Sequence, residues 1–274
     1  MPAYCDSQMI FLRHIGYHGT FIQVNHNMTA PLTYRLAKYI AHCGFCSRRA
    51  AERLITQGRV SLNGHQAKHT DLASSSDLIL IDQQKLANDT SPCYLAYHKP
   101  PGVDCNNRPD NRASIYQLLT QLPQRVFAVG RLDKDSSGLL LLTNDGALCQ
   151  RLLHPDNQHH KTYIVSTDKN ISPDFLQQMA SGVSWQLGQN HFQSKPCQVW
   201  QSGVQQFHIV LTQGLHRQIR YMCKTLGYRV ISLQRIAIGA LTLAELAEGD
   251  YRALTSDDIA SLLHPAAPPQ PNTE

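Results

Sequence analysis

Apolar residues recur at helical spacing from Tyr34 onward, and turn-forming residues divide this pattern into two short helices. The apolar face of the first helix consists of Leu36, Ile40 and Cys43. Gly44 is placed to end that helix, Ser47 to cap the start of the next, and Gly58 to end the second helix. The inner face of the second helix consists of Ala51, Leu54 and Ile55.

Short strands follow the two helices. Residues 60–62 have the apolar alternation of a strand, and Asn63-Gly64 is a strong signal for a two-residue hairpin turn. A further apolar strand closes a small α+β unit, which we place at residues 33–81. The polar stretch 82–92 is interpreted as a linker.

From residue 93, short apolar strands alternate with amphipathic helices. Strands are expected at 94–98, 125–129, 139–143, 162–166 and 207–212. Helices are expected at 145–153, 173–181 and 216–226. This mixing predicts a second α+β domain at 93–264, with a mixed or mainly antiparallel sheet.

The two ends of the chain lack such patterns. Residues 1–32 show neither a sustained period nor helix caps, so we expect a disordered leader. An alternative is an upstream extension from a misassigned start, with Met28 as the true first residue. Residues 265–274 contain four prolines and are expected to be a disordered tail.

Composition and charge limit the classes of function that are open to the chain. With 42% hydrophobic and 16% charged residues, the 274-residue chain is not wholly disordered. Its net charge of +5 is concentrated in two blocks, +6 over residues 33–70 and +5 over residues 215–236, while residues 237–274 carry −5. Clustered cations of this kind meet a polyanion such as nucleic acid, or form a solvated face.

The eight cysteines are too sparse for a disulfide scaffold, which favours a reducing, cytoplasmic location. Cys43 and Cys46 form a C-x-x-C motif without a second pair, so we interpret them as small buried residues beside a turn. A redox or zinc protein is the alternative reading of this pair. No run of 18 apolar residues occurs, so no membrane span is expected.

Two segments are candidates for chemistry. Asp133 lies in a polar loop between strands with Arg131 and Lys134 beside it, which suits either an ionised nucleophile or base, or a plain loop salt bridge. The stretch 214–222 begins a helix with Arg217 and Arg220, whose forked groups suit phosphate or carboxylate. An amphipathic solvent face is the alternative there.

Three other positions have plain structural readings. Asp145 precedes a helix and is interpreted as its cap. Lys99-Pro100-Pro101-Gly102 is interpreted as a turn after a strand. Tyr163 is either a core residue or an aromatic that faces a cleft and stacks on a base.

These segments, in this order, resemble the RsuA/RluB/RluE/RluF family of pseudouridine synthases, and most closely the RluF branch. The matching motifs are Gly130-Arg131-Leu132-Asp133, the run from Gly138 to Gly146, Lys161-x-Tyr163, and Arg217-Gln218-Ile219-Arg220 with Met222. Residues 34–64 resemble an S4 RNA-binding domain. The resemblance covers roughly 33–260 and implies an S4 domain followed by a pseudouridine synthase catalytic domain.

The resemblance implies a role for each matching residue. Asp133 would be the catalytic aspartate, which attacks or deprotonates the ribose at C1′. Arg131 would hold the flipped-out nucleotide, and Tyr163 would stack against the uracil. Ile219 would pack under the base, and Arg220 would pair with Asp133 and keep it charged. No cofactor or metal is implied, because isomerisation adds no group and changes no oxidation state.

The implied partner is structured RNA, with 23S rRNA as the first candidate target. The residues expected to bind it are Arg35, Lys38, Arg48, Arg49, Arg53, Arg59 and Arg217. Alternative targets are 16S rRNA, another 23S uridine or a tRNA anticodon uridine, and the alternative class is a non-catalytic RNA-binding ribosome-assembly factor. A monomer is expected. One departure from the family pattern is Tyr221, which stands where arginine is frequent.

Overall fold

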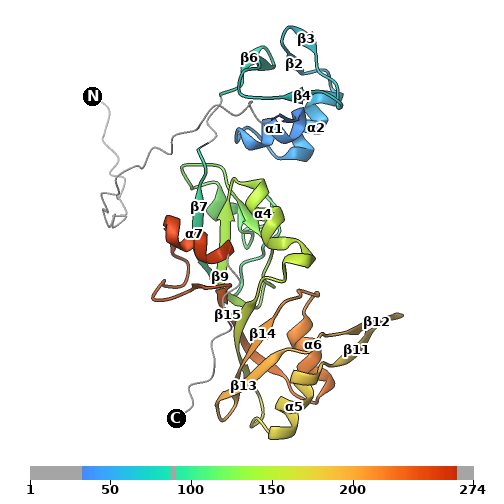
Figure 1. Cartoon of the computed structure of the whole chain (residues 1–274), viewed down its shortest axis with the longest axis vertical. Helices are drawn as coiled ribbons and strands as arrows, with labels where there is room; N and C mark the ends of the chain where they lie inside the picture. Colours follow the sequence, from blue (N-terminus) through green and yellow to red (C-terminus); the bar gives the residue numbers. More distant parts are fainter. Residues whose placement is uncertain (1–32, 88–90, 264–274) are drawn as a thin grey trace, which may run out of the picture.

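The computed structural model describes residues 33–87 and 91–263, which form a small helical and stranded domain followed by a larger domain built on one sheet (Figure 1). The expected leader at 1–32, with Met28, and the expected tail at 265–274 lie outside the described residues. Within the described part, no helix is long and apolar enough to cross a membrane.

The small domain packs two helices against short strands. Its elements are β1 (Tyr34–Arg35), α1 (Leu36–His42), α2 (Arg48–Thr56), β2 (Val60–Leu62), β3 (His65–Gln66), β4 (Leu72–Ala73), β5 (Ile79–Ile81) and β6 (Gln84–Lys85). The Ala50 amide donates to Ser47 Oγ at 3.2 Å, which confirms the predicted cap of α2. Asn63 and Gly64 both have positive φ, as the predicted hairpin turn between β2 and β3 requires.

The small domain extends further than the expected boundary at residue 81. Strand β6 lies in the stretch that we interpreted as a linker, and it pairs with β5. Leu86 is buried in the core of this domain, and its amide donates to the Ile79 carbonyl at 2.9 Å. The turn between these strands, Asp82-Gln83, has two left-handed residues but no glycine, which explains why the polar sequence concealed a hairpin.

The large domain contains a nine-stranded mixed sheet, and this confirms the predicted fold class. Its strands are β7 (Tyr94–Lys99), β8 (Phe127–Val129), β9 (Ser137–Thr143), β10 (Lys161–Thr167), β13 (Gln198–Gly203), β14 (Gln206–Leu211), β15 (Val230–Ile238), β16 (Leu241–Thr242) and β17 (Tyr251–Ala253). The main order is β13-β14-β10-β15-β9-β7-β17, with β16 on β15 and β8 on β9. Among these pairs, β15 with β9 is the parallel one.

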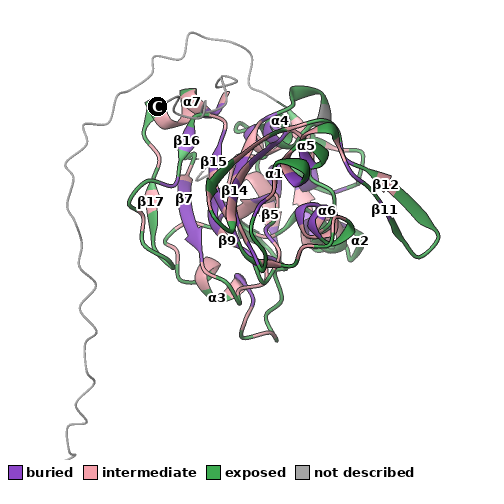
Figure 2. Ribbon diagram, turned by 90° about the horizontal axis from the view of Figure 1, so that it is seen from below, coloured by how far each residue is buried: buried purple, intermediate pink, exposed green. Residues whose placement is uncertain are grey.

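Helices and a hairpin flank this sheet. They are α3 (Tyr116–Leu119), α4 (Gly146–Leu153), a 3-10 turn at Pro155–Asn157, α5 (Pro173–Ser181), α6 (Gln218–Thr225), α7 (Ser256–Leu263), and the hairpin β11 (Ser184–Leu187) with β12 (Asn190–Gln193). Figure 2 shows buried residues along the central strands, whereas the hairpin projects from the domain and is mostly exposed.

The parallel pair joins two halves of the sheet, each with its own core. One half packs β7, β8 and β9 against α4 and α7, and the other packs β10, β14 and β15 against α5 and α6. The strands of the junction approach so closely at Gly138 that a Cβ there would collide with the backbone of Arg235. The residue must therefore be glycine for the halves to meet.

Candidate active site

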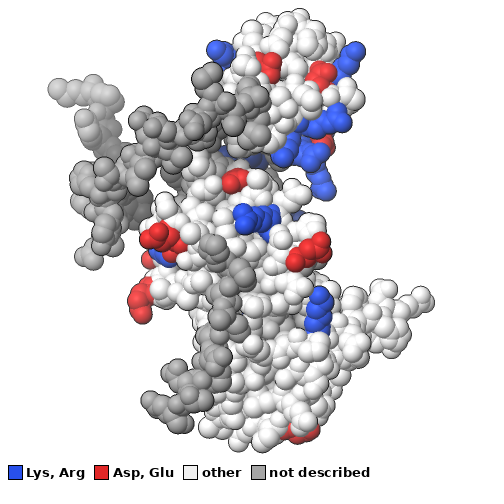
Figure 3. Space-filling model, in the orientation of Figure 1, with Lys and Arg blue, Asp and Glu red and all other residues white. Residues whose placement is uncertain are grey.

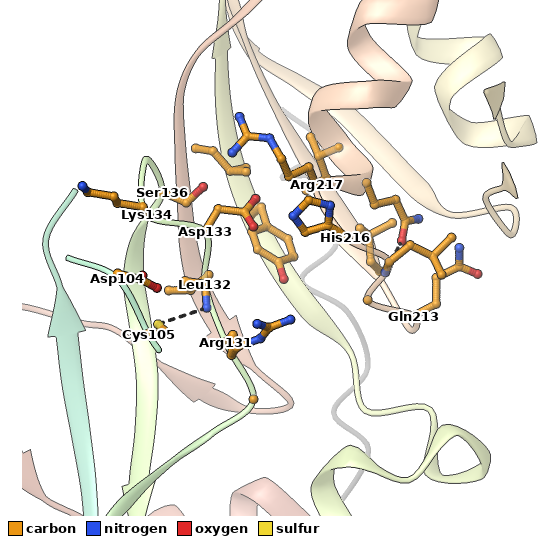
Figure 4. A pocket seen from close by; sticks show the side chains of 18 of the residues that line it. Asp104, Cys105, Arg131, Leu132, Asp133, Lys134, Ser136, Gln213, His216 and Arg217 are labelled. Carbon is orange, nitrogen blue, oxygen red and sulfur yellow. Dashed lines mark hydrogen bonds between the residues drawn. The ribbon is translucent and has the colours of Figure 1, made fainter. Parts of the chain in front are cut away.

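A cavity of about 550 Å³ lies where the two halves of the sheet meet. One wall is the loop from Gly130 to Ser136, which follows β8, together with residues 104–106. The other wall is formed by residues 213–219 at the start of α6, and Tyr163 of β10 also lines the cavity. Figure 4 shows the side chains of these walls around the opening.

Asp133 is presented to the cavity by a tightly held loop. Gly130 turns the chain after β8 with φ +73°, and buried Leu132 donates its amide to Cys105 Sγ at 3.4 Å. The Ser136 amide donates to the Asp133 carbonyl at 3.0 Å, which closes the turn. The Asp133 side chain is half-buried and points across the cavity toward His216 (Figure 4).

Within the described residues, no hydrogen bond or ion pair to the Asp133 carboxylate is found. Arg131 also lines the cavity, is exposed, and makes one long hydrogen bond of 3.4 Å to Asn106 Oδ1. The carboxylate and the guanidinium are thus both available to a bound molecule.

Arg220 bonds to Asp135 in the structure, which corrects the expectation that it pairs with Asp133. Its Nε lies 3.4 Å from Asp135 Oδ2, and its terminal nitrogen donates to the Asp135 carbonyl at 2.9 Å and to Ser136 Oγ at 3.3 Å. Arg220 does not belong to the cavity lining. Two aspartates, Asp133 and Asp135, lie two positions apart in this loop, and the one that Arg220 contacts is Asp135.

Arg217 also binds Asp135, through two parallel hydrogen bonds of 3.0 and 2.8 Å. This paired contact connects the Asp133 loop to the start of α6. Burial acts to raise the pKa of Asp135, but the hydrogen bond from Arg217 and the charge of Arg220 outweigh it and hold that pKa below its usual value. Arg217 has φ +52°, a left-handed conformation that costs a non-glycine residue and that the Asp135 contact helps to maintain.

Tyr163 and Ile219 form the apolar part of the lining. The β10–β15 register shifts between Thr162 and Tyr163, and such bulges re-aim side chains. Tyr163 is half-buried and contacts the cores of both halves of the sheet. Ile219 is buried in the first turn of α6. The structure thus brings Arg131, Asp133, Tyr163 and Ile219 into one cavity.

A fully buried lysine supports the loop at residues 100–103, which leads into residues 104–106 of the cavity wall. Lys99 Nζ donates to the carbonyls of Pro100 and Val103, both at 2.9 Å. Burial lowers its pKa, while Cys105, Asp135 and Asp133 act in the opposite direction. Sequence reasoning treated this segment as a turn only. The sequence feature that could have indicated this role is a charged residue at the end of an apolar strand, directly before two prolines.

The residues expected to bind RNA lie mostly on the small domain. Arg35, Lys38, Arg48, Arg49 and Arg53 are all exposed there. Figure 3 shows basic side chains gathered on the small domain at the side that faces the large domain. Four of the expected residues already have partners within the protein. Arg35 donates to the Thr70 carbonyl at 2.7 Å, Arg48 lies 3.2 Å from Glu52, Arg59 binds Asp82 at 2.6 and 2.7 Å, and Arg217 binds Asp135.

The cysteine pair Cys43 and Cys46 consists of two free thiols, the first buried and the second half-buried. Burial raises the pKa of both thiols, which reduces their reactivity at neutral pH. Over the described residues, no group of three or more His, Cys, Asp or Glu side chains is arranged to hold a metal ion.

Comparison with known proteins gives two family matches. The model of the RNA pseudouridylate synthase family matches residues 93–225, and that of the S4 domain matches residues 35–72. The first covers β7 through α6, including the cavity, and the second covers the helices of the small domain.

Curated relatives cover most of the chain. The dual-specificity RNA pseudouridine synthase RluF of Escherichia coli K12 is 39% identical over 239 residues, which span 86% of this chain and 80% of that protein. The ribosomal large subunit pseudouridine synthase B of Bacillus subtilis is 36% identical over 233 residues, or 83% and 95% of the two chains. A crystal structure of a pseudouridylate synthase matches with a TM-score of 0.61 and 31% identity, and covers 83% of this chain and 99% of that one.

Proposed function

This chain belongs to the RNA pseudouridylate synthase family, and we propose that Asp133 is the residue that carries its reaction. The enzyme is an isomerase that converts uridine in RNA to pseudouridine. The observation that carries the proposal is the position of Asp133, half-buried in the cavity that Arg131 and Tyr163 also line, with no hydrogen bond or ion pair to its carboxylate among the described residues.

The reaction exchanges one bond to the ribose for another. The bond between C1′ and N1 of uracil breaks, the base turns, and a bond between C1′ and C5 forms. C5 loses a proton and N1 gains one, so atoms and charge balance. The Asp133 carboxylate acts on the ribose at C1′ while the base is detached.

The other cavity residues hold the nucleotide during this exchange. The target uridine leaves its stack before the glycosidic bond is reached. Tyr163 then stacks against the uracil, Ile219 packs beneath it, and Arg131 holds the nucleotide backbone. Arg220 acts through Asp135, by fixing the loop that carries Asp133.

We propose 23S rRNA as the substrate. Two observations support it: the Bacillus subtilis relative is named for the large ribosomal subunit, and the motifs of this chain resemble most closely the RluF branch. The RluF name states dual specificity, so tRNA is included in the test. We also propose that the enzyme acts as a cytoplasmic monomer. Light scattering of the purified protein tests the monomer, and a mass of twice 30.7 kDa contradicts it.

The test is pseudouridine mapping of total rRNA and tRNA from a strain that lacks the gene. We expect one 23S position to lose the modification and to regain it when the wild-type gene is restored. A strain whose rRNA and tRNA keep every pseudouridine contradicts the proposed function. Loss in tRNA or 16S rRNA alone contradicts the 23S target.

The Asp133→Asn variant tests the role of the residue. Asparagine keeps the shape but removes the charge and the nucleophilic oxygen, so we expect unchanged RNA affinity and loss of activity by at least about a thousandfold. Asp156→Asn, an exposed change outside the cavity, serves as the matched control and should remain active. If the Asp133→Asn variant retains activity, Asp133 is not the residue that acts on the ribose at C1′.

A further inference from the structure

Three aromatic rings form a ladder beside α6, outside the cavity. Phe192 of β12 stacks on Trp185 of β11 at 5.7 Å between centroids and 14° between planes. Trp185 in turn stacks on Tyr221 of α6 at 6.3 Å and 9°. The ladder fixes the β11–β12 hairpin to the helix whose first residues line the active cavity.

The ends of the ladder are accessible, whereas its middle is not. Trp185 is 7% exposed, but Phe192 and Tyr221 are only half-buried. A hollow of about 470 Å³ lies against the hairpin and is lined by Ser184, Trp185, Gln186, His191, Phe192 and Gln193. A planar group therefore has both room and an aromatic face on which to continue the stack.

Two connections join the ladder to the rim of the cavity. Arg217, Tyr221 and Lys224 are spaced four and three residues apart, so they form one stripe along α6. The Lys195 amide, just beyond the hairpin, donates to Gln213 Oε1 at 3.2 Å, and Gln213 lines the cavity. A strand of RNA that leaves the cavity at Arg217 thus meets the ladder next.

The hairpin and α6 themselves contain no acidic residue, and Asp174 of α5 lies nearby, in a hollow that it lines together with Ser184 and Thr225. No Asp or Glu occurs between Asp174 and Glu245, a segment that includes the hairpin, α6 and β15. The same segment supplies exposed cations at Lys195 and Lys224. Aromatic faces flanked by cations are the arrangement that binds single-stranded nucleic acid.

We propose that the ladder Phe192–Trp185–Tyr221 is a second RNA-docking surface, on which an unpaired base flanking the target uridine stacks; this rests on the proposed function. In Figures 1 and 2 the hairpin projects on the same side of the molecule as α2 of the small domain. RNA held by that domain and entering the cavity therefore continues onto the hairpin.

The test compares Phe192→Leu with Phe192→Tyr in the full-length enzyme, with in vitro transcribed 23S rRNA and tRNA as the probes. Leucine keeps apolar packing against Trp185 but removes the π face, so KM should rise about tenfold while kcat is unchanged. Tyrosine keeps the face and should restore the wild-type KM. Tyr251→Leu removes a half-exposed ring on β17, away from the ladder, and should change nothing.

Three results overturn the proposal. The first is a KM for Phe192→Leu within twofold of wild type, as a ladder that binds a protein partner would also give. The second is a fall in kcat without a change in KM, which indicates displacement of α6 rather than lost RNA contact. The third is failure of Phe192→Tyr to restore KM. If wild-type enzyme forms no pseudouridine, the proposed function fails instead, and filter binding of the same transcripts still tests the ladder.

Discussion

At the scale of single residues, the two carboxylates of the loop from Gly130 to Ser136 have opposite environments. Asp135 is held by Arg217 and Arg220, whereas Asp133, two positions earlier, faces the cavity without an ion pair among the described residues. The loop turns between them, with the Ser136 amide bonded to the Asp133 carbonyl. One carboxylate therefore holds the walls together and leaves the other available for chemistry.

We predict that Asp135→Asn weakens both the fold and catalysis. It removes the ion pairs to two arginines, but Asp135 is about half exposed, so the loss of stability should be about 1 kcal/mol. Because the variant loosens the start of α6, kcat should fall about tenfold. Urea denaturation and steady-state kinetics measure the two effects. Wild-type kcat in this variant contradicts the positioning role.

The same variant has a defined pH signature. The pKa of Asp135 is lower in the folded than in the unfolded chain, so its stabilisation is present above about pH 4 and is lost as pH falls through the lower folded pKa. The difference in stability between wild type and Asp135→Asn should therefore be constant near pH 7 and shrink in acid. A difference that grows in acid contradicts the assigned contact.

At the scale of elements, the sequence predicted the helix caps and helix bounds that local residues determine. Ser47 capped α2 as expected, Asp145 accepts the amides of Ala147 and Leu148 at the start of α4, and α5 spans the predicted residues. The predicted linker contained β6, and β11, β12, β15 and α7 were not anticipated. β15 is stabilised by neighbours distant in sequence, β10 and β9, so its strand character depends on tertiary packing.

The candidate site likewise divides into residues that contiguous motifs indicate and contacts that exist only in the folded chain. The resemblance assigned roles to Arg131, Asp133, Tyr163 and Ile219 because each lies in a contiguous motif. The structure brings these residues into one cavity, and their roles stay predictions. The resemblance assigned Arg220 to the wrong aspartate, since a sequence motif does not specify which of two nearby carboxylates an arginine reaches. Lys99 was missed because its role is to hold carbonyl groups of its own loop, and that contact exists only in the folded chain.

We predict that Gly138→Ala disrupts the junction of β9 and β15. The added Cβ collides with the backbone of Arg235, and φ of +111° disfavours alanine, so the free energy of unfolding should fall by about 3 kcal/mol or more. Gly146→Ala is the matched control, because Gly146 begins α4 with open space around it. Thermal unfolding compares them, and equal melting temperatures contradict the close approach.

At the scale of the whole molecule, positive charge is divided between the helices of the small domain and the rim of the cavity. Arg49 and Arg53 of α2 are exposed and, within the described part of the chain, form no ion pair, so they are free to contact phosphates. Acidic residues are absent from the sequence between Asp174 and Glu245, which includes the start of α6 at the rim. We therefore expect RNA binding to be an electrostatic contact across both domains.

We predict that Arg49→Gln with Arg53→Gln weakens binding of 23S rRNA and raises KM while kcat stays constant. Each lost phosphate contact should reduce the slope of log affinity against log salt concentration by about one unit or slightly less. Filter binding between low and moderate salt measures the slope. Lys85→Gln, on the exposed strand β6, is the control and should leave it unchanged. An unaltered slope in the double variant excludes α2 from the RNA contact.

The parallel junction of β9 and β15 also sets the order in which the enzyme matures. β9 ends at Thr143 and β15 begins at Val230, so the intervening chain must be synthesised before the strands can pair. Closing so long a loop carries an entropic cost and slows folding. On the ribosome, the small domain and the strand bearing Gly138 emerge first, and the cavity around Asp133 is assembled only after β15, which supplies Leu233 to its lining, has been translated. Catalytic competence therefore arrives late in synthesis, after the small domain has already formed.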